Sequence, residues 1–189
     1  MLKIVTTPNS ILTTATKKVE QFDDSLNKLV KEMERVLSAQ VNPQGVGLAA
    51  PQVGKNLSVF VIKPTPDAKT ETFINPRIIN FEAGNPEGSE KHAANPQGSE
   101  VKKKKKHRLE GCLSIPKIWG SIKRAKKVLF EFKDLNGKAH KKWFSGFKAT
   151  IIQHEIDHLQ GILFTQRALE QNSQLYEEKE GKLKKLLTK

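Results

Sequence analysis

Two histidines and a glutamate lie at metal-binding spacing late in the chain, within the sequence QHEIDHLQG. His154 and His158 are four residues apart, so a helix places both imidazoles on one face, one turn from each other. Glu155 can then reach a water molecule on the same metal ion without being a ligand itself, which is the HExxH arrangement of metal-dependent hydrolases. The spacing predicts a hydrolytic metal site that needs at least one more ligand.

The residue types leave two candidates open for that third ligand. A glutamate from a downstream helix would give the site of an endopeptidase, and such residues are available at Glu170, Glu177, Glu178 and Glu180. The other candidate is Cys112, the only cysteine, because the glycine before it and Pro116 after it indicate irregular backbone that could aim a thiolate. A lone cysteine is also a common small core residue, so the spacing alone does not choose.

The first half of the chain predicts one helix and two strands. Apolar residues with a 3.6-residue period predict a helix over about 24–40, and a glycine-bearing loop follows at 45–52. The apolar run 57–62 predicts a buried strand, and 73–81 predicts a second strand that is broken at Pro76.

The second half predicts the element that carries the histidines. Asn136-Gly137 between the segments 126–135 and 138–144 predicts a hairpin. A helix over about 147–160 carries the HExxH motif, and a last, highly charged helix is expected over 166–187.

One segment, at about 84–108, differs in composition from the rest. The sequence NPEGSE at 85–90 recurs as NPQGSE at 95–100, and a run of lysines follows at 102–106. Segments rich in Pro, Gly and Ser do not form a packed core, so a surface insertion is expected. The remainder predicts a single catalytic domain over 1–168 with a charged helical extension over 166–189.

Composition limits the class of protein. The 189 residues include 33 Lys and Arg against 20 Asp and Glu, and the resulting formal charge of +13 predicts attraction to anionic surfaces such as nucleic acid. No apolar stretch approaches the ~18–20 residues of a membrane span, so no membrane association is expected. A single cysteine and no visible secretory signal favour a reducing compartment, the cytoplasm, or an organellar matrix if a presequence precedes this sequence.

Three stretches, taken together and in order, resemble the motifs of the peptide deformylase family: GVGLAAPQ at 45–52, EGCLS at 110–114 and QHEIDH at 153–158. The resemblance extends from about residue 2 to residue 168. It implies an α+β fold in which antiparallel β-sheets surround a central helix that carries the HExxH motif.

The resemblance also implies the reaction and the metal. Members remove the N-formyl group from the N-terminal formylmethionine of nascent polypeptides and release formate. The metal ligands would be Cys112, His154 and His158, which leaves one position open for water. One divalent ion is implied, with Fe²⁺ expected physiologically and Zn²⁺, Ni²⁺ or Co²⁺ in purified protein.

Further roles follow from the same resemblance. Glu155 would be the catalytic acid and base, while Gln52 and the backbone N–H of Leu113 would stabilise the oxyanion. Gly47 would lie along the substrate backbone. The methionine side chain would enter an apolar pocket that includes Val46, Phe147, Thr150 and Ile151.

The basic segments predict a partner. Because the implied substrate emerges from ribosomes, we expect electrostatic ribosome contact through Lys102–Lys106, the lysine-rich segment 117–148 and the charged segment 166–187, without sequence-specific nucleic-acid binding. Two other hypotheses remain: an endopeptidase, and a basic RNA-binding protein whose metal is structural and has four protein ligands.

Two ion-pair expectations complete the sequence analysis. Glu110 is expected to pair with Arg124. Asp157 either orients a metal ligand or makes an exposed helical ion pair with a lysine.

Overall fold

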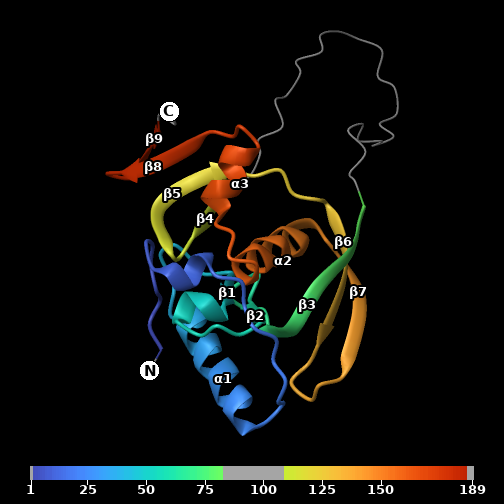
Figure 1. The fold of residues 1–189 in the computed structure, drawn as a ribbon. Coiled ribbons are helices and arrows are strands. Elements are labelled where there is room, and N and C mark those ends of the chain that lie inside the picture. Colours follow the sequence, from blue (N-terminus) through green and yellow to red (C-terminus); the bar gives the residue numbers. More distant parts are fainter. Residues whose placement is uncertain (1, 83–108, 187–189) are drawn as a thin grey trace.

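Two antiparallel β-sheets lie around one central helix, α2 (Gly146–Leu159), in the computed structural model of the chain (Figure 1). The structure describes residues 2–82 and 109–186, so the insertion expected at about 84–108 lies outside the described residues. The architecture confirms the α+β class and places the HExxH helix at the centre.

The larger sheet has five strands, and its second strand is buried on both faces. The strand order is β1 (Gly47–Ala49), β2 (Val59–Ile62), β3 (Glu71–Glu82), β6 (Lys127–Lys133) and β7 (Ala139–Ser145). Phe60 and Ile62 pack in the cluster that includes α2, whereas Val59 and Val61 pack in the cluster that includes α1. Burial on both faces explains why this segment is an uninterrupted apolar run.

The helix α1 (Asp24–Ser38) covers the outer face of β1 and β2 and agrees with the predicted helix over 24–40. Its start is fixed by the Asp23 carboxylate, which accepts hydrogen bonds from the backbone N–H groups of Ser25 and Leu26. Its buried face has the predicted helical period and consists of Leu26, Val30, Met33 and Leu37.

The predicted hairpin around Asn136-Gly137 is present as β6 and β7. The break expected at Pro76 does not end the strand. Strand β3 continues through Pro76, and only its pairing with β6 shifts register, between Ile74 and Arg77. A proline lacks the N–H that a regular ladder needs, so an irregularity there is the expected accommodation.

The smaller sheet holds the third metal-ligand candidate. Its order is β4 (Leu109–Cys112), β5 (Ile115–Ser121), β8 (Leu175–Lys179) and β9 (Lys182–Lys185). The short helix α3 (Phe164–Glu170) packs against this sheet, and two 3₁₀ turns, η1 (Ser10–Thr13) and η2 (Ala50–Val53), complete the described elements. No helix among the described residues is long and apolar enough to cross a membrane.

The helix predicted over 166–187 is wrong. Helix α3 stops at Glu170, and the following residues form the β8–β9 hairpin, which turns at Glu180 and Gly181. Both turn residues have positive φ, 52° and 72°, as a two-residue hairpin turn requires. Strand β8 is stabilised by pairing with β5 and by burial of Leu175, and these tertiary contacts outweigh the weak helical pattern.

Candidate metal centre and active site

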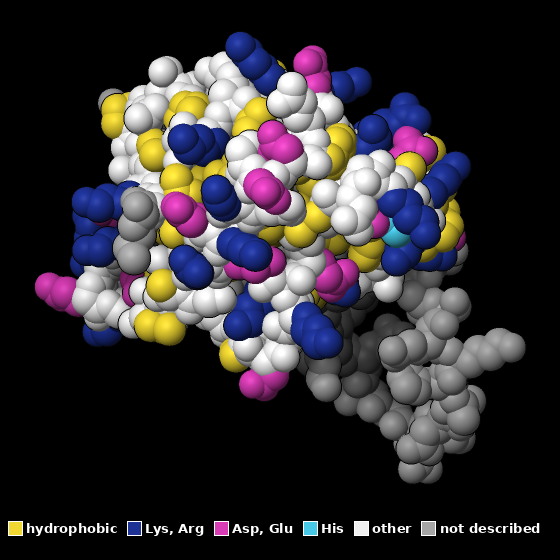
Figure 2. All heavy atoms as spheres, turned by 90° about the horizontal axis from the view of Figure 1, so that it is seen from below, with side chains coloured by type: hydrophobic (Ala, Val, Ile, Leu, Met, Phe, Trp, Pro, Cys, Tyr) yellow, Lys and Arg dark blue, Asp and Glu magenta, His cyan; other side chains and the backbone are white. Residues whose placement is uncertain are grey.

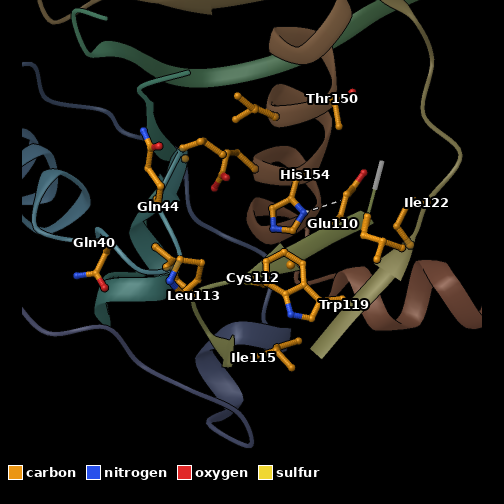
Figure 3. A pocket seen from close by; sticks show the side chains of 18 of the residues that line it. Gln40, Gln44, Glu110, Cys112, Leu113, Ile115, Trp119, Ile122, Thr150 and His154 are labelled. Atoms are coloured by element: carbon orange, nitrogen blue, oxygen red, sulfur yellow. Dashed lines mark hydrogen bonds and ion pairs between the residues drawn. The ribbon is translucent and has the colours of Figure 1, made fainter. Parts of the chain in front are cut away.

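Three side chains from two elements, strand β4 and helix α2, converge at one point. Cys112 ends β4, and His154 and His158 lie one turn apart on α2; their candidate ligand atoms lie within 4.8 Å of one another. The Sγ atom of Cys112 is 3.1 Å from Nε2 of His158. Figure 3 shows Cys112 and His154 beside each other in the pocket. The thiol from the sheet and the two imidazoles from the helix therefore form one cluster.

The chemistry of this cluster fits a catalytic divalent metal ion. Burial opposes ionisation of the Cys112 thiol, but His158 and His154 outweigh burial and hold its pKa well below the usual value. The thiolate is the form of cysteine that binds metal. Three protein ligands with a cleft on the remaining side are typical of catalytic sites, whereas structural sites are closed by four. The donor set thus matches one metal ion with an accessible position.

A chain of ion pairs that starts at Glu110 holds the imidazole of His154 in place. Its Nδ1 atom is 3.1 Å from Oε2 of Glu110, and Arg124 donates hydrogen bonds to both oxygens of that carboxylate (Figure 3 marks the first contact). Arg124 also donates to Asp157 at 2.6 Å, and Arg167 donates to the same aspartate at 2.8 Å.

These contacts decide the two ion-pair expectations. The Glu110–Arg124 pair is confirmed. The exposed lysine pair considered for Asp157 is wrong, because this carboxylate is buried between two arginines. Burial would raise the pKa of Glu110, but the contacts with His154 and Arg124 outweigh burial and lower it. The Glu110 carboxylate therefore stays ionised and can hold the imidazole in one orientation.

Glu155 lies beside the cluster and has no partner for one of its oxygens. Its side chain is buried, and Oε2 makes no hydrogen bond among the described residues. Burial raises the pKa of this carboxyl group to about 7. Gly47 faces it from β1, where a Cβ atom would collide with the Glu155 carboxylate. The site thus keeps a carboxyl group that can exchange a proton near neutral pH.

The amide of Gln52 is oriented by the backbone. Its Oε1 accepts a hydrogen bond from the N–H of Ala49 at 2.8 Å, which identifies the oxygen and leaves the NH₂ group toward the cluster. That nitrogen lies 3.4 Å from Sγ of Cys112 and 3.3 Å from Oγ of Ser114. A hydrogen-bond donor is therefore fixed at the metal cluster before any substrate binds.

Comparison with known proteins identifies the family of this site. The family model for polypeptide deformylase matches residues 1–174. The chain belongs to the polypeptide deformylase family. As a deformylase, it is a metal-dependent hydrolase that removes the formyl group from N-formylmethionyl peptides.

Individual relatives agree with this assignment. The deformylase is 38% identical over 163 residues to the peptide deformylase of Borreliella burgdorferi, a match that covers 86% of this chain and 85% of the relative. It is 37% identical to that of Dictyoglomus turgidum, over 89% of this chain and 93% of the relative. The crystal structure of the Thermotoga maritima peptide deformylase superposes with a TM-score of 0.70 at 31% identity and covers 88% of this chain and 97% of that one.

The deformylase has a cleft of about 1270 Å³ that opens onto the metal cluster. All residues expected in the substrate pocket line it, together with Gln52 and Leu113: Val46, Gly47, Phe147, Thr150 and Ile151. Phe147 is 37% exposed, whereas Ile151 is 3% exposed and also packs in the core. The structure therefore brings every predicted site residue to one place, and their individual roles remain predictions.

One interaction in the cleft, between Trp119 and Glu178, was missed in the sequence, where Glu178 was considered only as a possible metal ligand. Trp119 of β5 packs over Gly111, and its indole N–H donates to Oε2 of Glu178 at 2.9 Å. No local pattern marks this pair, because it depends on the pairing of β5 with β8. The only sequence feature that could have indicated the position of Trp119 in the cleft is its closeness in sequence to Cys112.

The described residues do not supply the metal ligands that the two competing hypotheses require. The endopeptidase needs a downstream glutamate at the metal, yet the cluster contains none of the four candidates; Glu170 pairs with Arg167, and Glu178 bonds to Trp119. A structural metal needs four ligands, and the described part of the chain supplies three.

Proposed function

We propose that Cys112, His154 and His158 hold the metal of this deformylase, and that Glu155, Gln52 and Leu113 assist the hydrolysis of the formyl amide. The observation that carries this proposal is the convergence of the Glu155 carboxyl group and the Gln52 NH₂ group on the three donors. A divalent ion held there supplies a Lewis acid that polarises a carbonyl group and acidifies water.

The protein groups account for the proton transfers. Glu155 accepts a proton from the attacking water as the water oxygen bonds to the formyl carbon, and it returns that proton to the amine nitrogen when the C–N bond breaks. The products are formate and a peptide with a free amine. A pKa of about 7 suits this exchange, because the group can both take and give the proton near neutral pH.

Gln52 and the backbone N–H of Leu113 stabilise the negative charge on the formyl oxygen. The Gln52 amide is held by the backbone N–H of Ala49, so little free energy is needed to reorient it during the reaction. Gly47 lets the substrate backbone approach the Glu155 carboxylate, and Phe147 and Ile151 contact the methionine side chain.

Formate release tests the assignment. We expect protein purified anaerobically with Fe²⁺ to release formate from formyl-Met-Ala-Ser. Glu155→Gln should retain metal but lose at least about 100-fold in kcat, since general acid–base catalysis contributes about 10²–10⁴-fold. Cys112→Ala should lose the metal. A Cys112→Ala variant with unchanged metal content would contradict the ligand assignment.

We propose Fe²⁺ as the physiological ion. A thiolate with two imidazoles accepts Fe²⁺, Co²⁺, Ni²⁺ and Zn²⁺, and affinity alone favours Zn²⁺ over Fe²⁺, so occupancy follows availability. Metal analysis of protein purified anaerobically from cells, paired with kcat for each reloaded ion, tests this choice. A higher kcat with Zn²⁺ than with Fe²⁺ would contradict it.

We also propose electrostatic contact with the ribosome and a location in the cytoplasm or an organellar matrix. The charge of +13 supports the contact, although Lys and Arg lie among Asp and Glu on the face shown in Figure 2. Co-sedimentation should weaken steeply with salt. Replacement of Lys102–Lys106 by Ser should lower the affinity, and an unchanged affinity would remove that lysine run from the explanation.

A further inference from the structure

Three lysines line the active-site cleft outside the catalytic machinery. Lys117 lies within β5, Lys123 follows the end of that strand, and Lys126 immediately precedes β6. All three residues are exposed, and none of them makes an ion pair with another described residue. Their ammonium groups are therefore available to a peptide that occupies the cleft.

The acidic residues of the cleft do not balance these lysines. Glu110 is paired with Arg124, and Glu155 is buried beside the metal cluster. Among the acidic lining residues that the structure describes, only Glu178 remains, and its Oε2 already accepts the Trp119 indole N–H. The unpaired side chains of the described lining thus carry three positive charges against one negative charge.

We propose that the cleft selects formylated peptides that carry an acidic side chain in the residues following the formylmethionine. An extended peptide advances about 3.3 Å per residue, so its second and third residues extend beyond the catalytic groups while staying close to them. A cleft lined by one sign of charge concentrates the opposite charge, because its low-dielectric walls focus the field. This inference rests on the proposed function, since it concerns the same cleft.

The charges are expected to act on binding more than on the chemical step. An interaction that is equal in the bound substrate and in the transition state lowers KM and leaves kcat unchanged. Exposed charges are also screened by salt over about 10 Å at 0.1 M ionic strength. The preference should therefore appear in kcat/KM at low salt and fade as salt is added.

A matched pair of peptides measures the preference. Formyl-Met-Ala-Asp amide and formyl-Met-Ala-Asn amide have the same shape and differ in one charge. For the metal-loaded enzyme we expect kcat/KM to be about threefold to tenfold higher for the Asp peptide at 20 mM salt, and nearly equal for both peptides at about 0.5 M salt.

Charge-matched variants locate the effect. The triple variant Lys117→Gln, Lys123→Gln, Lys126→Gln should bring the Asp/Asn ratio of kcat/KM close to one. A control with the same loss of charge, made at exposed lysines outside the cleft, should keep the wild-type ratio: Lys28→Gln, Lys31→Gln, Lys55→Gln. Glu178→Gln retains a hydrogen-bond acceptor for Trp119 and should raise the ratio, because it removes the opposing charge.

The outcomes separate this inference from the proposed function. A ratio near one for the wild type at low salt, with normal formate release, overturns the inference and leaves deformylation intact. A control variant that flattens the ratio as much as the cleft variant also overturns it, because net charge would then be the cause. No formate release from either peptide would instead overturn the proposed function.

Discussion

The Nδ1 atom of His154 lies 3.1 Å from Oε2 of Glu110, a carboxylate that accepts hydrogen bonds in turn from Nε and Nη2 of Arg124. This contact engages one ring nitrogen and leaves Nε2 as the nitrogen available to a metal ion. Because Arg124 also binds Asp157 on the same helix as His154, the orientation of the imidazole depends on a buried network that links β4, α2 and the segment before β6.

Glu110→Gln should weaken metal binding without removing a ligand. The amide cannot provide the negative charge that orients the imidazole and increases its basicity, so metal affinity should fall by about 10-fold to 100-fold. Competition with a chelator measures the change. Glu131→Gln is the control, because Glu131 pairs with the exposed Arg77 and does not line the cleft. Equal metal affinities for the two variants would contradict a positioning role for Glu110.

Gly47→Ala should disable the enzyme while the metal stays bound. The added Cβ atom would overlap the Glu155 carboxylate and contact Ile151, so the proposed general base must move. A displacement of about 1 Å can cost about 100-fold in rate, and we expect a loss of that size in kcat/KM. Metal content should stay at the wild-type level, since the three atoms nearest to the added Cβ belong to Glu155 and Ile151 and none belongs to a proposed metal ligand. Wild-type activity would show that the carboxylate tolerates displacement.

Much of the fold could be predicted because its signals are local. The Asp23 cap and apolar period of α1, the Asn136-Gly137 turn and the HExxH spacing of α2 each lie within a short segment, and each element formed where it was expected. The C-terminal hairpin could not be predicted in this way. Strand β8 is stable because β5 offers it an edge and a place for Leu175, and no short window of sequence contains that information.

The candidate site also combines features that local sequence predicts with features that depend on tertiary contacts. The spacing of His154 and His158 predicts two donors on one face of a helix. The choice between Cys112 and a downstream glutamate required either the family motifs or the position of β4 beside α2. The pairing of Trp119 with Glu178 joins strands that are distant in sequence, so only the structure reveals it.

Glu155→Gln should stabilise the metal-free protein in a pH-dependent way. The folded state raises the pKa of Glu155 from 4.5 to about 7, so it binds the proton more tightly than the unfolded chain does. Stability contributed by this group therefore falls as pH rises from about 4.5 to 7, by roughly 3 kcal/mol at most. Glutamine does not ionise, so the variant avoids that loss.

Urea unfolding at several pH values measures this effect in chelator-treated protein. The free energies of unfolding of wild type and Glu155→Gln should be similar near pH 4.5, and the advantage of the variant should increase up to about pH 7 and then level off. A difference that is constant with pH would show that the burial of the Glu155 charge is not its cause.

Leu175→Ala tests the hairpin that replaced the predicted C-terminal helix. Leu175 is 6% exposed and packs in the cluster with Phe164 and Ala168, so truncation should lower the free energy of unfolding by about 2–5 kcal/mol. Leu183→Ala on β9 is the matched control, because that side chain is 48% exposed and should cost only about 0.5 kcal/mol. A helix with weak amphipathicity would expose both leucines to a similar extent. Similar small losses for the two variants in urea unfolding would therefore argue against the docked hairpin.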